Sequence, residues 1–347
     1  MAKKVIDDEC LNQFVSSLME RGYTVVAPRK EGRRIVYGEV ETGADFLREY
    51  RNPQNSPKNL LFPRREEMLS FTDDGEVIEV VPDEAKTVLL GVRPCDAMAV
   101  THLDTIFNWD YGDVYYNRRR RNTILIGLAC NTPDPTCFCT SLGNGLGPHQ
   151  KEKVDMMLTK LEEGSYLVEA VSKAGEELLS LITCGVQGKP SHDAKALELK
   201  ERAEKMITKR LDVDKTFKVL DENFDSDYWK DVARKCIGCG ICTYLCPTCY
   251  CFDIQDEGTS RVRFWDSCQF SLYAKHATGH NPRDQRFKRY RNRVYHKFVY
   301  FKKNFDAILC VGCGRCKIYC PMKVDIFKIV SEAEVNVVNL GRGEASE

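Results

Sequence analysis

The chain has 347 residues, with 51 Lys+Arg against 51 Asp+Glu and 43% hydrophobic residues. A chain of this length and apolar content can form about two domains with packed cores, which excludes global disorder. No apolar run approaches the ~18 to 20 residues of a membrane span, and the charged N-terminus lacks the apolar stretch of a secretory signal, so we expect a cytoplasmic protein outside the membrane.

The first half of the chain alternates predicted helices and strands. Apolar residues at helical spacing predict an amphipathic helix over 7–20. The runs 87–92 and 123–128 are continuously apolar, as in central strands that are buried on both faces. Between these two runs, 96–107 is predicted to be a helix. The other predicted strands cover 24–27, 34–40, 77–81 and 166–171, and the other predicted helices cover 150–163, 174–183 and 192–211.

The order strand, helix, strand around 96–107 has a topological consequence. Such a crossover is right-handed and makes the two strands parallel, so both carboxyl ends lie at one edge of the sheet. We therefore predict an α/β domain over 1–190, followed by a charged helical linker over 191–225.

Seventeen cysteines are an unusual feature of the composition. In a cytoplasm they should remain thiols, which favours metal ligation over disulfides. Eleven of them lie between Cys236 and Cys320. Of the six that come earlier, Cys10 and Cys184 lie in predicted helices, and we expect them to be buried free thiols.

Two copies of one motif, C-x2-C-x2-C-x3-C-P, begin at Cys236 and Cys310. This run holds [4Fe–4S] clusters in two-cluster ferredoxins, where the fourth cysteine of each run binds the other cluster. A pair of zinc sites is the alternative, but a tetrahedral zinc site has no use for a third evenly spaced cysteine followed by Cys-Pro. The predicted ligands are Cys236, Cys239, Cys242 and Cys320 for cluster 1, and Cys310, Cys313, Cys316 and Cys246 for cluster 2.

The two motifs lie farther apart than in a small β-rich ferredoxin, and the chain between them has helical spacing. We therefore predict that 226–347 is a mainly α-helical, ferredoxin-like domain. The segment 261–303 carries twelve Lys and Arg against Asp266 and Asp284. Four-thiolate clusters are anionic, so these cations can stabilise a reduced cluster or dock an acidic partner; a solvated helix face is the alternative, and nucleic-acid binding is not expected.

Three further cysteines, Cys249, Cys251 and Cys268, follow the first motif. Three thiols are one short of another four-cysteine cluster site. They are either small buried residues packed against the clusters or additional redox or ligand thiols, and the spacing leaves both interpretations open.

Four cysteines of the predicted α/β domain come after the two central strands. Cys95 follows the strand 87–92, and Cys130, Cys137 and Cys139 follow the strand 123–128. By the crossover argument all four can meet at one sheet edge, the usual place for a site in an open α/β sheet. Four thiolates there can hold a third [4Fe–4S] cluster, although the spacing also fits zinc or free thiols.

The combination of these motifs resembles a known family. The residues that carry the resemblance are Arg-Pro-Cys95-Asp, Cys130-x6-Cys137-Phe-Cys139, Cys246-Pro-Thr-Cys249-Tyr-Cys251, Trp265-Asp-Ser-Cys268, Arg293-x2-His296-Lys297 and Val311-Gly-Cys313-Gly-Arg-Cys316. They are similar to the iron–sulfur subunits of anaerobic sulfite reductase and of cytoplasmic nickel–iron sulfhydrogenase, where this is the beta subunit. The resemblance favours the third cluster, because the family pattern includes Cys95, Cys130, Cys137 and Cys139 together.

The resemblance implies a function as well as cofactors. Such subunits carry electrons between a flavin subunit that uses NAD(P)H and a catalytic subunit of hydrogenase, sulfite reductase or heterodisulfide-reductase type. We therefore expect an electron-transfer subunit of a cytoplasmic, anaerobic hetero-oligomeric oxidoreductase, with no catalytic residues or substrate site of its own. The alternative is a catalytic subunit that reduces a sulfur compound at its own cysteine or cluster site.

Overall fold

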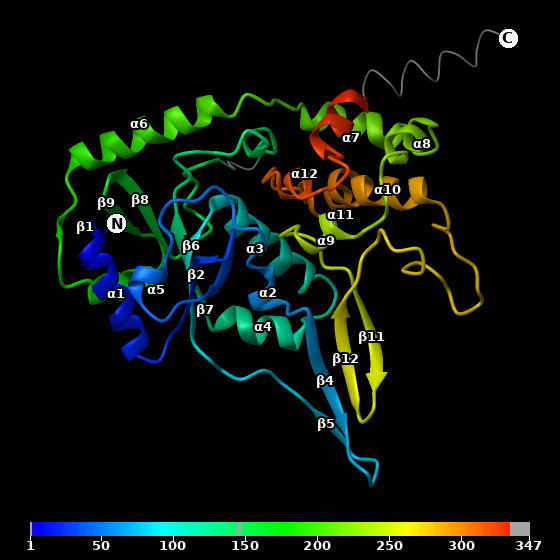
Figure 1. Ribbon diagram of the computed structural model, residues 1–347, viewed down its shortest axis with the longest axis horizontal. Coiled ribbons are helices and arrows are strands. Elements are labelled where there is room, and N and C mark those ends of the chain that lie inside the picture. The colour runs from blue at the N-terminus through cyan, green and yellow to red at the C-terminus, as the bar shows by residue number, and fades with distance from the viewer. Residues whose placement is uncertain (1, 144–146, 334–347) are drawn as a thin grey trace.

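The computed structural model describes residues 2–143 and 147–333 (Figure 1). Residues 334–347, at the end of the predicted second domain, lie outside the described residues. None of the helices in the described ranges is long and apolar enough to cross a membrane.

An eight-stranded mixed sheet, in the order β10-β1-β9-β8-β7-β6-β2-β3, forms the N-terminal half. Strands β6 (Thr87–Val92) and β7 (Thr123–Leu128) are parallel neighbours in its centre, which confirms the topology predicted for these two runs. The other strands are β1 (Lys3–Asp7), β2 (Thr24–Glu31), β3 (Arg34–Glu39), β8 (Met156–Glu162), β9 (Ser165–Ala170) and β10 (Val186–Gln187).

Helices cover both faces of this sheet, which explains why its central strands are continuously apolar. Val88 and Leu90 of β6 pack in the same core as residues of α1 (Asp8–Glu20) and α5 (Lys173–Leu181). Leu89, between them, points to the opposite core, which includes residues of α2 (Lys58–Leu61), α3 (Pro94–Ile106) and α4 (Val114–Arg121). Side chains along a strand alternate between its faces, so a strand with two buried faces has no polar position.

The helix predicted over 150–163 is wrong. The structure has strand β8 there, paired antiparallel with β9 across the turn at Gly164. Met156 and Leu158 pack in one core and Met157 in the other, so this apolar run is a buried strand. A short apolar run has no periodicity that separates a buried strand from a helix.

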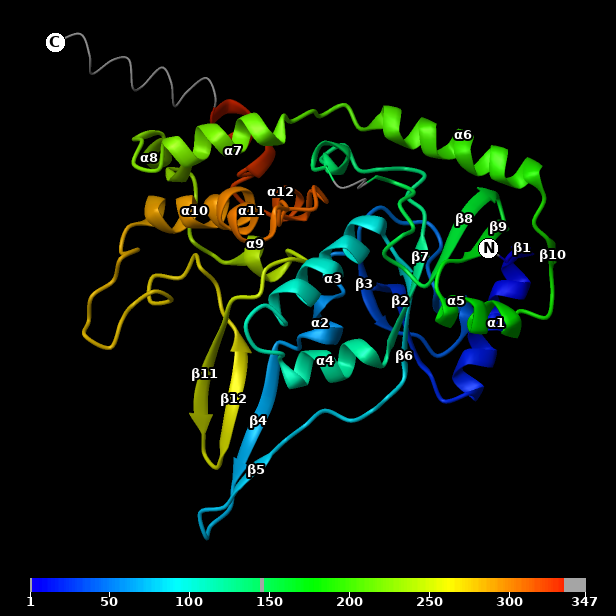
Figure 2. The same ribbon diagram turned by 180° about the vertical axis from the view of Figure 1, so that it is seen from behind.

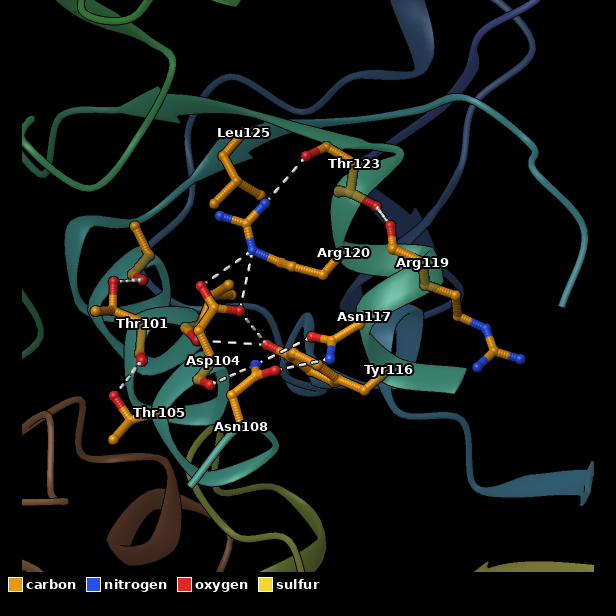
Figure 3. A network of polar contacts seen from close by, with 12 residues as sticks. Thr101, Asp104, Thr105, Asn108, Tyr116, Asn117, Arg119, Arg120, Thr123 and Leu125 are labelled. Atoms are coloured by element: carbon orange, nitrogen blue, oxygen red, sulfur yellow. Dashed lines mark hydrogen bonds and ion pairs between the residues drawn. The ribbon is translucent and has the colours of Figure 1, made fainter. Parts of the chain in front are cut away.

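A polar network fixes α3 against α4 (Figure 3). The Asp104 carboxylate of α3 accepts hydrogen bonds from Tyr116 Oη at 2.6 Å and from Arg120 Nε at 3.1 Å. One helical turn farther along, the side-chain amides of Asn108 and Asn117 pair with each other. Because α3 begins next to Cys95, this network also fixes the position of that cysteine.

A second sheet, in the order β11-β12-β4-β5, projects as an arm from the rest of the molecule (Figures 1 and 2). Its four antiparallel strands are β4 (Arg65–Phe71), β5 (Val77–Glu79), β11 (Phe252–Glu257) and β12 (Ser260–Trp265). The prediction that residues 226–347 are mainly α-helical is therefore wrong. The alternating run after Cys251 forms a hairpin instead, because strand β4, distant in the sequence, offers it a pairing edge.

Short helices make up much of the remaining chain. Helix α6 (Pro190–Met206), which the sequence predicted, crosses from the large sheet toward the C-terminal elements, and its Leu199 packs on Leu161 and Leu167. The other helices are α7 (Val213–Glu222), α8 (Tyr228–Ala233), α9 (Ile241–Tyr244), α10 (Arg286–Tyr295), α11 (Phe301–Phe305) and α12 (Arg315–Ile318). A π-helical segment, His296–Tyr300, joins α10 to α11 without a break.

Cys10 and Cys184 are joined as a disulfide, so the prediction of two free thiols is wrong. Cys10 lies on α1, whereas Cys184 lies in the segment after α5 and not in a helix. Both helices pack on the same face of the large sheet, which places the two Cα atoms 5.8 Å apart across 174 residues of sequence. The other fifteen cysteines are free.

Candidate functional site

The first set of cysteines, which we call site 1, comprises Cys236, Cys239, Cys242 and Cys320. All four line one cavity, together with Tyr290 and Arg293. Cys320 comes from the second motif, so the structure brings together the residues that the exchange of fourth cysteines predicts. Cys239 is exposed, and the neighbouring Ile237 is 56% exposed, so this set lies next to the protein surface.

Site 2 comprises Cys310, Cys313, Cys316 and Cys246. Burial raises the pKa of each of the first three thiols, and repulsion from the Cys246 thiolate adds to the increase. Cys246, from the first motif, therefore lies close to all three cysteines of the second. Cys316 also lines the site 1 cavity, so sites 1 and 2 are adjacent.

Site 3 comprises Cys95, Cys130, Cys137 and Cys139, and these four cysteines line one cavity. Cys95 lies at the start of α3 and Cys130 follows β7, as the predicted crossover required. Burial raises the pKa of all four thiols. Gly312 and Cys313 form part of the same cavity wall, so site 3 adjoins site 2.

Two glycines of the second motif allow this contact. The amide of Phe138 donates to the carbonyl of Gly312 at 3.0 Å, and the Cys137 thiol lies 3.9 Å from the carbonyl of Cys313. A Cβ at Gly312 would lie 2.6 Å from the Cys139 amide nitrogen, and one at Gly314 would lie 1.9 Å from a threonine hydroxyl. Both glycines also have positive φ, so larger residues there would separate the two loops.

A buried ion pair joins the same two loops. Arg315, between two cysteines of site 2, donates from Nη1 and Nη2 to the Asp96 carboxylate at 2.6 and 2.7 Å. Asp96 follows Cys95 of site 3, and both side chains of the pair are 0% exposed. Tyr37 Oη donates a third hydrogen bond to Asp96 at 3.0 Å. The pair holds α3 against the second motif.

Other cations around the cysteines have no such partner. Arg93, beside site 3, donates to backbone carbonyls only, including that of Ala129 at 2.8 Å. Lys58 donates to two carbonyls, Lys297 to the Thr248 hydroxyl, and Arg293 to the Cys249 sulfur. All four cations are at most 5% exposed, and in the described part of the chain none pairs with a carboxylate.

Buried charge of this kind needs compensation. An uncompensated cation in a protein interior is costly, so the negative charge must come from nearby groups. Cysteine thiolates lie close to each of these cations, and thiolate-bound clusters are anionic. The residues present therefore fit [4Fe–4S] clusters at these sites.

The geometry is also relevant to the zinc alternative. Within residues 2–143 and 147–333, no three His, Cys, Asp or Glu side chains are arranged to hold a metal ion. The cysteines of sites 1 and 3 surround cavities instead.

The three additional cysteines lie together next to site 2. Cys249 makes a thiol hydrogen bond with Cys246, and Cys251 makes one with Cys268. These contacts continue from one pair to the other, because the charges of Cys249 and Cys268 also interact. The interpretation as small residues packed near the clusters agrees with this placement, and so does that of additional redox thiols.

Sequence reasoning did not identify Asp96, Arg93, Lys58, Lys297 or Arg315 as site residues. Two signals could have pointed to them. Arg93 and Asp96 flank the cysteine in Arg-Pro-Cys-Asp, and Arg315 lies inside the second cysteine motif. Lys58 had no such signal, because it reaches the cysteines from α2, which lies far earlier in the chain.

Comparisons with known proteins agree with this arrangement. Residues 235–324 match the 4Fe-4S dicluster domain family. Over 342 residues the chain is 32% identical to sulfhydrogenase 2 subunit beta of Pyrococcus furiosus, a match that covers 96% of this chain and 98% of that protein. A chain of the xenon-derivatised F420-reducing [NiFe] hydrogenase complex from Methanosarcina barkeri is 14% identical, with a TM-score of 0.35 over 63% of this chain and 92% of that one. This third likeness is too distant to carry an argument, whereas the second covers both chains almost completely, and the chain therefore belongs to the iron–sulfur subunit family that includes sulfhydrogenase 2 subunit beta.

Proposed function

We propose that this chain is an electron relay with three [4Fe–4S] clusters held by sites 1, 2 and 3. The observation that carries the proposal is the series of contacts between the sites. Site 3 meets site 2 through the contact between Cys137 and Cys313, and site 2 meets site 1 through Cys316 in a shared cavity wall. Neighbouring centres in such a series can exchange electrons over short distances.

The protein's own residues have defined roles in this proposal. The cysteines of each site would hold one cluster, and a bound [4Fe–4S] cluster supplies one-electron transfer. The buried cations Arg93, Arg293 and Lys297 lower the cost of placing additional negative charge in the interior. The pair between Arg315 and Asp96 keeps sites 2 and 3 in contact.

The same contacts define an order. Site 2 lies between the others, so electrons would pass from site 3 to site 1, or in the reverse direction, through it. Cys239 and Ile237 place site 1 next to the surface, where a partner can approach. The partners we propose are a subunit with flavin that uses NAD(P)H and a catalytic subunit; the relative that names the family is itself a sulfhydrogenase subunit.

Anoxic purification of the full chain tests the relay. We expect about twelve irons per chain, because three clusters hold four each, with paramagnetic signals that appear on reduction. The proteins that copurify with the native chain should include one that binds flavin, and NAD(P)H should reduce the clusters only in its presence. A colourless protein that retains zinc but no iron, or a purified native chain without partner subunits, would contradict the proposal.

A further inference from the structure

The thiols of Cys251 and Cys268 form a pair at the base of the β11–β12 hairpin. Cys251 directly precedes β11, and its carbonyl accepts the amide of Asp266, which directly follows β12, at 2.9 Å. This pairing of the strand ends brings the two thiols into hydrogen-bonding contact. Neither residue belongs to site 1, 2 or 3.

We propose that Cys251 and Cys268 are a redox-active dithiol that reduces disulfides, with Cys251 as the attacking residue and Cys268 as the resolving residue. The proposal rests on the relay proposed above for its supply of electrons. It goes beyond that relay by adding a centre that takes two electrons and a substrate class, R–S–S–R, to a chain otherwise expected to have neither.

The surroundings of the two thiols differ in the way that such chemistry requires. Cys251 is half-buried and also interacts with the Tyr273 hydroxyl, whereas Cys268 is only 5% exposed and its sulfur accepts a hydrogen bond from Gln269 Nε2 at 3.4 Å. The hydrogen bond from Cys268, with help from the nearby Lys58 ammonium, lowers the pKa of Cys251 to about 6. Thiolate is the nucleophilic form of cysteine, so Cys251 is the thiol suited to attack.

A cavity gives a substrate access to this pair. Tyr273 and Gln269, which contact the two thiols, also line an open cavity beside the site 1 loop. Its wall carries three cations and two carboxylates, Lys275, Arg286, Arg289, Asp253 and Asp266. It also includes the rings of Phe252 and Phe270. This lining suits a disulfide with anionic groups more than a neutral or cationic one.

The steps balance as ordinary thiol–disulfide exchange. The Cys251 thiolate attacks R–S–S–R, so the substrate S–S bond breaks, a mixed disulfide forms and one R–S⁻ leaves. The Cys268 thiol then loses its proton and attacks the Cys251 sulfur, which expels the second R–S⁻ and leaves a Cys251–Cys268 disulfide. Two electrons and one proton return this disulfide to a thiolate and a thiol. Cys249, which contacts both Cys246 and the pair, lies between the relay and the dithiol.

The first test examines the exchange without the relay. The anoxic full chain with its iron is mixed with glutathione disulfide, a small anionic R–S–S–R, and the cysteine peptides are mapped by mass spectrometry. We expect a Cys251–Cys268 disulfide in the wild-type chain, glutathione attached at Cys251 in Cys268→Ser, and at least a tenfold slower reaction in Cys251→Ser. The double variant Cys10→Ser/Cys184→Ser removes the cystine present in the structure from the thiol count and should react as the wild type does.

Several results would overturn the proposal. Wild-type rates in Cys251→Ser, or an unmodified Cys251 in a Cys268→Ser chain with full iron content, would do so. If either variant loses its iron, the wild-type peptide map decides alone, and the absence of the Cys251–Cys268 disulfide would refute the pairing. Insulin as a second substrate separates small from protein disulfides, and reaction with either one supports the dithiol.

The second test adds the relay. The chain is reduced with titanium(III) citrate, freed of excess reductant and mixed with glutathione disulfide. We expect two thiols released for every two electrons lost from the iron–sulfur absorption. Exchange in the first test without electron loss in the second would overturn the coupling to the relay and leave the dithiol in place. Absence of any reducible iron signal would instead contradict the relay itself.

Discussion

Replacement of Asp96 by Asn should destabilise the protein more than the loss of any surface ion pair. Asp96 and Arg315 are both 0% exposed, and the carboxylate accepts two hydrogen bonds from the guanidinium. Removal of one partner from a buried pair leaves the other charge uncompensated, at a cost of about 3–5 kcal/mol. We expect about 3 kcal/mol, the lower end of that range, because Asn retains an oxygen for Tyr37 and thiolates of Cys95 and Cys313 also face Arg315.

Thermal unfolding of the anoxic protein at one scan rate measures this effect. At roughly 2 °C per kcal/mol for a chain of this size, Asp96→Asn should lower Tm by about 6 °C. The matched control is Glu198→Gln, which breaks the exposed pair with Lys195 and should leave Tm unchanged. The double variant Asp96→Leu/Arg315→Met leaves no buried charge and should lose less stability than Asp96→Asn alone.

Two results would refute this reasoning. A Tm for Asp96→Asn that equals the Tm of Glu198→Gln would mean that the buried pair does not hold α3 against the second motif. A double variant less stable than Asp96→Asn would mean that the packing of these side chains, and not their charge, decides the stability.

Four other predictions follow from the sites and the buried groups. Cys320→Ser should remove the iron of site 1 and leave that of site 2, as measured by iron content and electron paramagnetic resonance; the opposite loss would show that the fourth ligands are not exchanged. Cys137→Ala should remove about four of the twelve irons, and full retention would argue against a cluster at site 3. Lys297→Gln should lower the reduction potential of site 2 in a redox titration, because a buried positive charge near Cys246 is lost, while Lys288→Gln on the exposed face of α10 should not change it. Burial lowers the pKa of His102 to about 4, so the unfolded state binds a proton that the folded state does not, and stability should fall by roughly 3 kcal/mol as the pH drops from about 6.5 to 4; His102→Gln should show a flatter pH dependence of unfolding.

Several elements could be predicted from the sequence because their signals are local. The cysteine spacing in the two motifs depends on a few neighbouring positions, and the matched dicluster family covers the same region. The apolar runs of β6 and β7, with a helix between them, imply a parallel pair, because a crossover between such strands is nearly always right-handed. From that topology alone, Cys95 and Cys130 could be placed at one edge of the sheet.

Other features depend on contacts between distant segments, which no local pattern contains. The hairpin after Cys251 became a strand pair because β4 supplies its edge, and α1 and α5 bring Cys10 to Cys184 by packing on one face of the large sheet. The contact of site 3 with site 2 needs two left-handed glycines and a buried ion pair between residues 219 positions apart. Local spacing determined which cysteines could form each site. Only the tertiary structure decided how the sites meet and which buried cations face them, because burial and charge compensation are properties of the folded interior and not of neighbouring positions in the chain.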